Sequence, residues 1–250
     1  MPTPPEEKNE LVMSFLSVRR ALGALGFFLP LSLLAVVILT PAIMQPSISE
    51  FYYTSGRELF TGTLSAIAVF LWAYVGYPMA ATDRWPSDRL VSRVAALAAL
   101  GVAFIPTSSA LGLVVTPGAT ANCTLIQCAI GSFWAQWLHY TSAGIFFACL
   151  ATFCLVLFCR TGPGPRTRGK QGRDRIYTTC GWAIVGCILA LVVYGYVYAH
   201  SDAAGQAALD TTRAVFILET IGIFAFAISW MVKGETLKPL QRMVEPKADP

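Results

Sequence analysis

The sequence predicts an all-α polytopic membrane protein, a bundle of six transmembrane helices with both termini in the cytoplasm. Of its 250 residues, 55% are hydrophobic and 13% are charged, whereas soluble globular domains usually carry about 25% charged residues. The apolar residues form continuous runs of about 20 residues, the length a helix needs to cross ~30 Å of hydrocarbon. The runs do not alternate polar with apolar residues, so they predict helices and not strands of a membrane barrel.

The runs give a transmembrane domain over residues 21–235, between a cytoplasmic tail over 1–20 and a second cytoplasmic tail over 236–250. The six predicted helices cover about 21–44, 60–81, 94–115, 139–159, 176–199 and 214–232.

Two of these helices carry a further local signal. The helix over 94–115 is rich in small residues, which let neighbouring backbones approach closely, and Pro106 predicts a kink that frees a backbone carbonyl group. The helix over 139–159 follows an apolar stretch with two tryptophans, 125–138, which we expect to form a short interfacial helix.

The basic residues are distributed unequally between the two sides of the predicted bundle. Sixteen of the 18 Lys and Arg fall in the two tails and in the loops after the second and fourth helices. Only Arg57 and Arg213 fall on the other side. Because cytoplasmic loops carry the excess of Lys and Arg, this asymmetry places both termini in the cytoplasm. It also accounts for the net charge of +4 without a nucleic-acid partner.

The segment 160–175 is basic and rich in Gly and Pro. It is typical of a flexible loop that sets topology, and it also suits contact with anionic lipid headgroups, worth about 1 kcal/mol per basic residue near the surface.

The seven cysteines divide into two groups. Five lie within predicted helices, where a free thiol behaves as a small apolar group. Cys123 and Cys128 lie in an outer loop, where an oxidising compartment favours a disulfide. The chain has two histidines and no pattern of metal ligands, so we expect neither a metal nor a cofactor.

Polar groups gather in the outer half of the predicted helices. The second, fourth and sixth helices run from outside to inside, so their positive N-terminal ends face outward. Such ends, each next to a basic residue, suggest an anion site. Glu219 lies about 8 Å below the outer boundary, a depth at which a carboxylate needs a partner. The predicted outward-facing pocket comprises Arg57, Glu58, Thr61, Ser65, Thr107, Ser108, His139, Ser142, Arg213 and Glu219.

Four of these residues also have a structural interpretation. Arg57 with Glu58 or Glu50 would form an interfacial ion pair, His139 would be an interfacial residue, and Glu219 would accept a structural hydrogen bond or pair with an arginine.

Three classes of function follow. A one-sided pocket favours a non-catalytic protein that binds a lipid headgroup, a small amphiphile or a membrane partner. A proton-coupled solute transporter would use Glu219. An intramembrane hydrolase would pair Ser142 or Ser108 with His139, although no nucleophile elbow supports it.

Four segments resemble a family of six-helix bacterial membrane proteins of uncharacterised function: SISEFYYTSGRELFTGTLSAIAVFLWAYVGY, ALGVAFIPT, HYTSAGIFF and FILETIGIFAFAISWMVKGE. The resemblance covers most of residues 20–235 and implies a six-helix bundle in a bacterial inner membrane. It implies no catalytic residues. The chain is more loosely similar to tetraspan and hexaspan proteins implicated in lipid handling, and it lacks the histidine ligands of alkaline-ceramidase-like hydrolases.

Overall fold

The fold is helical throughout the residues that the structure describes. A computed structural model of the chain describes residues 5–76, 86–107, 123–160 and 167–237, with the backbone alone for 5–14. Four helical segments are long and apolar enough to cross a membrane: Phe15–Leu39, Leu125–Leu157, Arg168–Ala199 and Ala214–Lys233. The described residues are therefore all-α and include four candidate membrane-spanning helices.

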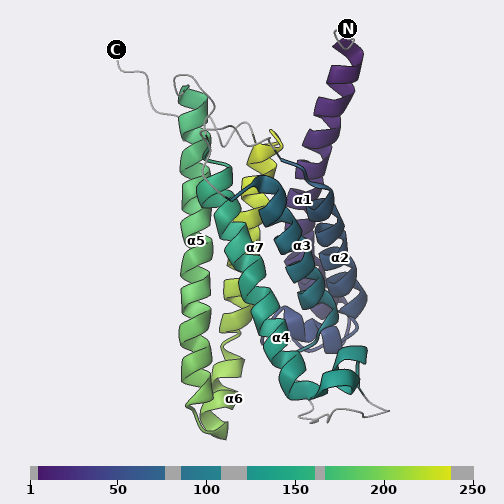
Figure 1. Cartoon of the computed structure of the whole chain (residues 1–250). Helices are drawn as coiled ribbons and strands as arrows, with labels where there is room; N and C mark the ends of the chain where they lie inside the picture. Colours follow the sequence, from purple (N-terminus) through teal and green to yellow (C-terminus); the bar gives the residue numbers. More distant parts are fainter. Residues whose placement is uncertain (1–4, 77–85, 108–122, 161–166, 238–250) are drawn as a thin grey trace.

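The helices lie side by side in a long bundle (Figure 1). We call the end at which α1 begins and α7 ends the terminal end, and the opposite end the distal end. The elements are α1 (Pro5–Leu39), η1 (Ser49–Tyr53), α2 (Arg57–Ala73), α3 (Asp88–Phe104), α4 (Leu125–Thr152), η2 (Phe153–Leu157), α5 (Arg168–Ala199), α6 (Ala203–Thr211) and α7 (Ala214–Lys233).

Two helices are shorter than the sequence predicts. Helices α2 and α3 have 17 residues each, which gives a length of only ~26 Å. Helix α2 ends at Ala73 and the chain turns at Gly76, whose φ is 68°. Helix α3 ends at Phe104, because the residue before a proline disfavours helical backbone, so Pro106 ends the helix where a kink was expected. Residues 77–81 and 108–115 of the predicted helices lie outside the described residues.

Other boundaries also differ from the prediction. Helix α1 begins at Pro5, within the predicted tail, and α5 begins at Arg168, with Thr167 as its N-cap. The predicted interfacial helix is the first part of α4, which changes direction at Gly131, where φ is 82°. The loop before α7 contains a helix that the hydropathy pattern did not indicate, α6, with Asp202 as its N-cap.

Six helices form a ring in the order α1, α2, α3, α4, α5, α7, and α7 packs back on α1. Small residues allow close approaches around it: Gly26 meets Ala227 and Phe226 of α7, and Gly101 of α3 meets Ser142 of α4. Helix α5 packs both on α4 and on η2, which continues α4.

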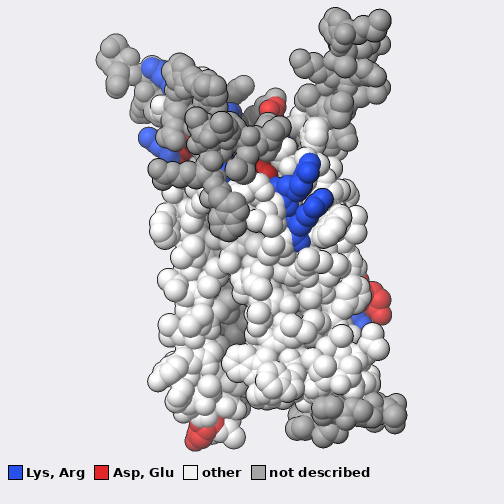
Figure 2. Space-filling view, viewed as in Figure 1, with Lys and Arg blue, Asp and Glu red and all other residues white. Residues whose placement is uncertain are grey.

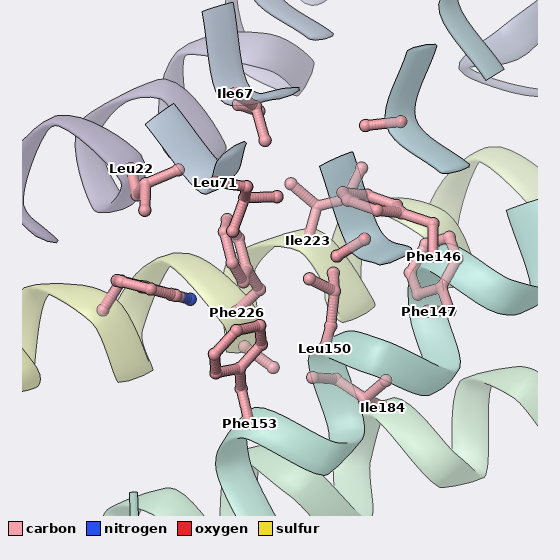
Figure 3. Close-up of a cluster of buried hydrophobic side chains, with 14 of the residues drawn as sticks. Leu22, Ile67, Leu71, Phe146, Phe147, Leu150, Phe153, Ile184, Ile223 and Phe226 are labelled. Carbon is pink, nitrogen blue, oxygen red and sulfur yellow. The ribbon is translucent and has the colours of Figure 1, made fainter. Parts of the chain in front are cut away.

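The core fills the centre of this ring (Figure 3). Buried side chains from all six helices of the ring and from η2 meet there, among them Leu22, Leu71, Phe146, Phe153, Ile184 and Phe226. Towards the terminal end, Trp230 makes edge contacts with the rings of Tyr74 and Phe158, with centroids 4.9 and 5.1 Å apart. Burying aromatic side chains of this size supplies much of the packing free energy.

Charge separates along the long axis of the bundle. Figure 2 shows Lys and Arg side chains towards the terminal end and a broad uncharged region in the middle of the face. Two described arginines lie elsewhere: Arg57 begins α2, and Arg213 precedes α7. An uncharged belt of this kind is what a helix bundle presents to hydrocarbon.

Candidate functional site

The polar groups of the distal end converge on the segment between α1 and α2, residues 46–56, which we call the connector. Its one helical turn, η1, places Ser49 and Phe51 inside the bundle, 5% and 0% exposed. A connecting segment that enters a bundle carries backbone polar groups with it, and these need partners. The neighbouring helices supply those partners.

Helix α7 binds the start of the connector. The backbone N–H of Phe216 donates to the carbonyl of Pro46 over 2.9 Å. The backbone N–H of Ile48 donates to Glu219 Oε2 over 2.7 Å. The ring of Phe51 lies against that of Phe216, with centroids 6.0 Å apart. The buried carboxylate of Glu219 thus has a hydrogen-bond partner, and this partner is the backbone amide of Ile48.

His139 of α4 joins the connector to the end of α3. Its Nδ1 lies 2.5 Å from the carbonyl oxygen of Ile105 and its Nε2 lies 3.0 Å from Ser49 Oγ. A carbonyl oxygen only accepts, so Nδ1 carries the proton, and in the neutral ring Nε2 accepts from the Ser49 hydroxyl. The carbonyl released where α3 ends therefore finds its donor in His139, which is 2% exposed.

A second set of bonds holds the end of the connector. The hydroxyl of Tyr53 donates to the carbonyl of Thr107 over 2.8 Å. The side-chain amide of Gln127 donates to the Tyr53 oxygen over 3.1 Å. Gln127 also completes the capping box of α4 with Thr124. The connector is thereby bound to α3, α4 and α7 together.

A small cavity of about 30 Å³ lies beneath the connector. Ser49 and Glu219 are its polar lining residues, and apolar side chains such as Leu29, Phe60 and Val102 form the rest. This volume holds about one water molecule. Ser49 and His139 have the spacing of a nucleophile and its base, but the adjacent space would not admit a substrate. We therefore assign the pair to anchoring the connector.

Other predicted pocket residues lie apart from this network. Arg57 and Glu58 are exposed. The Arg57 side chain donates to the Tyr52 carbonyl over 2.6 Å and stacks over the Tyr52 ring at 4.6 Å. The Thr61 hydroxyl donates to the carbonyl of Arg57, and Ser65 is half-buried.

The remaining predicted residues have separate roles. Thr107 contributes its backbone carbonyl to the connector, and Ser108 lies outside the described residues. Ser142 donates to the Leu138 carbonyl and packs against Gly101. Arg213 has left-handed backbone, with φ 54°, and donates to the Asp210 carbonyl over 3.0 Å.

Beside the connector, the distal half of α5 has no buried residue. The inward face of α5 is buried through Ile184 and Cys187, but no residue from 188 to 199 is buried, although Leu191, Tyr194 and Tyr198 continue the same face. The ribbons of α4 and α5 diverge towards the distal end in Figure 1. We use the name distal cleft for the α5 face of Leu191, Tyr194 and Tyr198, which is not buried.

Polar groups surround this cleft. The hydroxyls of Tyr194 and Tyr198 donate to the Asp210 carboxylate over 3.5 and 3.4 Å. Tyr140 of α4 lies within electrostatic range of Glu50 and Glu219. The cleft thus joins an apolar wall on α5 to hydroxyls and carboxylates at its distal rim.

Glu50 belongs to the same rim. Burial raises the pKa of its carboxyl group above 4.5, the Ser47 hydrogen bond and Arg213 lower it, and Asp210 raises it. Glu50 is therefore close enough to the α6–α7 junction to interact with both charges there.

Replacing Glu50 by Gln should stabilise the protein at pH 8. The raised pKa means that folding favours the protonated carboxyl, so its stabilising contribution is lost as pH rises through the folded-state value. Glutamine keeps an oxygen that accepts from Ser47 without the charge. We expect a higher Tm for Glu50→Gln at pH 8 and equal values near pH 4, measured in detergent. A Tm advantage that persists unchanged at the lower pH would contradict this origin.

Replacing Glu219 by Leu should cost about 2 kcal/mol, because the Ile48 N–H loses its acceptor inside the bundle. Glu219→Gln keeps an oxygen at that position and should cost less than half as much. Equilibrium unfolding of the two variants in detergent measures the difference. Equal losses would mean that the hydrogen bond does not hold the connector.

The sequence analysis missed several residues of the connector and of the distal cleft. Ser49 and Tyr53 lie in a short inter-helix segment, where polar residues are ordinarily solvated. Tyr194 and Tyr198 did carry a signal, since they are four apart and lie seven and eleven residues after Cys187, on one helical face.

A disulfide joins Cys123, which precedes α4, to Cys128 near the start of that helix, and the two Cα atoms are 5.4 Å apart. It lies next to Thr124, the N-cap of α4. Among the described residues, no group of three or more His, Cys, Asp or Glu side chains could hold a metal ion. Comparisons of the chain with protein-family models, curated proteins and solved structures found no match.

Proposed function

We propose that this is a six-span inner-membrane protein of bacteria, with both termini cytoplasmic, that binds the headgroup of an outer-leaflet lipid or a small amphiphile in the distal cleft. The bacterial location follows from the family resemblance of the segments beginning at Ser47, Ala99, His139 and Phe216. The observation that carries the binding proposal is the unburied inward face of α5 from Leu191 to Tyr198.

The distribution of basic residues supports the topology. The described Lys and Arg, other than Arg57 and Arg213, lie towards the helix ends at the terminal end, which the positive-inside rule assigns to the cytoplasm. Helices α2 and α3 are short, but they lie in the same ring as the longer helices and run in opposite directions. A helix slightly shorter than the hydrocarbon is accommodated by local thinning of the bilayer.

The topology is tested by labelling with a membrane-impermeant maleimide. Ser55 is exposed at the distal end and Thr236 is exposed after α7 at the terminal end. We expect Ser55→Cys to be labelled in intact cells and Thr236→Cys only after lysis. The reversed pattern would refute the proposed orientation.

The chemistry of the cleft supports an amphiphilic ligand. Leu191 and the rings of Tyr194 and Tyr198 offer apolar surface for a chain, and the rim offers Asp210, Glu50 and Arg213 for a polar headgroup. Tyrosine is suited to such a boundary because one end of its side chain is apolar and the other polar.

Native mass spectrometry of the detergent-extracted protein tests the binding. Leu191→Trp should fill the cleft and abolish a retained lipid or amphiphile. The matched control is Leu189→Trp, because Leu189 is 61% exposed on the outer side of α5. We expect the control to retain the ligand as the wild type does. Absence of any retained ligand from the wild type, or equal retention by both variants, would refute cleft binding.

A further inference from the structure

The outer face of α3 carries a row of exposed side chains that changes from basic to apolar along the helix. The members of the row are separated by four, four, three and four residues, so they lie within about 80° of one another around the helix. We call them the α3 outer row: Arg89, Arg93, Leu97, Leu100 and Phe104, all exposed. The opposite face of the helix is buried in the bundle.

The basic part of the row lies where the uncharged belt begins. Helix α3 starts at the terminal end and runs towards the distal end (Figure 1), and Figure 2 shows basic side chains at the border of the uncharged region. Arg93 lies five residues after the start of α3, about 8 Å along its axis. A basic side chain at this depth lays its apolar stem along the bundle and extends its charge to the headgroup level.

Within the described part of the chain, neither guanidinium group of the row has an ion pair or a hydrogen bond. Asp88, the acid at the start of the same helix, is 5% exposed and pairs with Arg160 instead. The other acids towards this end whose side chains are described, Asp174 and Glu235, lie in α5 and after α7, whereas the neighbours of α3 in the ring are α2 and α4. Two like charges one turn apart repel each other, so this pair favours an anion from outside the described chain.

An exposed tryptophan of the neighbouring helix positions one of the two cations. The guanidinium carbon of Arg93 lies 5.4 Å from the centroid of the Trp72 ring, and Trp72 lies one residue before the end of α2. Stacking on a ring fixes a guanidinium group and leaves the N–H donors in its plane available. Trp72 and Val69, 53% and 65% exposed, also extend the apolar surface beside the row. Tryptophan is typical of the level at which hydrocarbon meets headgroups.

We propose that the α3 outer row binds one anionic phospholipid, with its phosphodiester between the two arginines and an acyl chain along the three apolar side chains. The arginine Cα atoms are about 6 Å apart along the helix axis, so both guanidinium groups can donate to one phosphate. From Arg93 to Phe104 the row extends about 17 Å, close to half of the ~30 Å hydrocarbon thickness. The site is separate from the distal cleft and from the lipid contact expected for 160–175.

The test titrates phosphatidylglycerol into the full-length protein in neutral detergent, with phosphatidylcholine of the same acyl chains as the reference. Native mass spectrometry gives the Kd of each successive lipid. We expect a site that prefers phosphatidylglycerol, because no ammonium group offsets its phosphate. Arg93→Gln and Arg89→Gln should each raise the Kd of that site about tenfold, through the loss of a charge-assisted hydrogen bond. Both side chains are exposed, so Tm without added lipid should stay unchanged, which separates lost binding from lost folding.

The matched control is Arg57→Gln. Arg57 is also an exposed arginine stacked on an aromatic ring, that of Tyr52 at 4.6 Å, but it lies at the distal end, beside Glu58 and one turn before the polar Thr61. We expect this variant to bind phosphatidylglycerol as the wild type does. A lipid held by 160–175 would remain in every variant. The proposal is overturned if the wild type shows no preference for phosphatidylglycerol, if Arg93→Gln weakens none of the bound lipids, or if Arg57→Gln weakens binding as much as Arg93→Gln.

Discussion

Replacing His139 by alanine should lower the free energy of unfolding by about 4 kcal/mol. The imidazole is 2% exposed and joins three elements, because it donates to the Ile105 carbonyl and accepts from Ser49. Alanine would leave a buried carbonyl without its donor, at about 1–3 kcal/mol, and would open a cavity where the ring packs. Of the connector's bonds to α4, the one between Gln127 and Tyr53 would remain.

Two control variants separate these contributions. His200, the other histidine, is exposed at the end of α5 and bonds to the carbonyl of Tyr196 in its own helix, so His200→Ala should change stability by less than about 0.5 kcal/mol. His139→Asn places an amide N–H near the position of Nδ1 and should recover part of the loss. Equilibrium unfolding in mixed micelles measures all three. Similar losses for His139→Ala and His200→Ala would contradict the anchoring role.

A second consequence of His139→Ala concerns the connector alone. Ser55 is exposed in the wild type, whereas Ser49 is buried with its hydroxyl on the imidazole. Two bonds hold Ile48 and Ser49 in the bundle: Ile48 N–H to Glu219 and Ser49 to His139. Without the imidazole only the bond to Glu219 remains, so this part of the connector should separate from the bundle more often. Hydrogen exchange of the Ile48 amide should therefore accelerate in His139→Ala before global unfolding.

The sequence supports the helical class and the membrane environment because both depend on additive properties of long segments. The run over 176–199 is apolar throughout and becomes the longer helix α5. The residues at which helices end are harder to predict from hydropathy, because they depend on single residues and on tertiary contacts. Helix α3 ends at Phe104, two residues before Pro106, and the Ile105 carbonyl finds a donor on another helix, His139.

The polar sites could be predicted only in part. Glu219 and His139 are notable in the sequence because they are polar residues at depth, and both contact the connector in the structure. What they contact could not be foreseen, because no hydropathy pattern says that the segment after α1 folds back into the bundle. Glu58 illustrates the opposite case. Glu58, Thr61 and Ser65 lie at positions i, i+3 and i+7 on one helix face and were all expected in the pocket, but α2 buries the face of Phe60, Thr63 and Ile67. Spacing identifies a shared face, and tertiary packing decides which face turns inward.

Replacing Gly76 by alanine should destabilise the protein by about 3 kcal/mol. Gly76 has φ 68°, a conformation that costs other residues roughly 1–2 kcal/mol. A Cβ atom there would also overlap the Cβ and Oδ2 atoms of Asp88, the first residue of α3. Asp88 is 5% exposed and pairs with Arg160, so it cannot move aside without disturbing that pair.

The matched control for Gly76→Ala lies in the preceding helix. A Cβ atom added to Gly62 in α2 would meet open space, so Gly62→Ala should stabilise the helix by about 0.5–1 kcal/mol. The two changes are chemically identical and differ in backbone conformation and surroundings, so their opposite signs test the turn itself. Gly76 sets the direction in which the chain leaves α2 towards α3. The lost stability of Gly76→Ala should therefore appear as a lower Tm. Weaker packing between the two helices should appear as faster hydrogen exchange along α3. If Gly76→Ala were as stable as Gly62→Ala, the left-handed turn beside Asp88 would not be required for α3 to pack on α2.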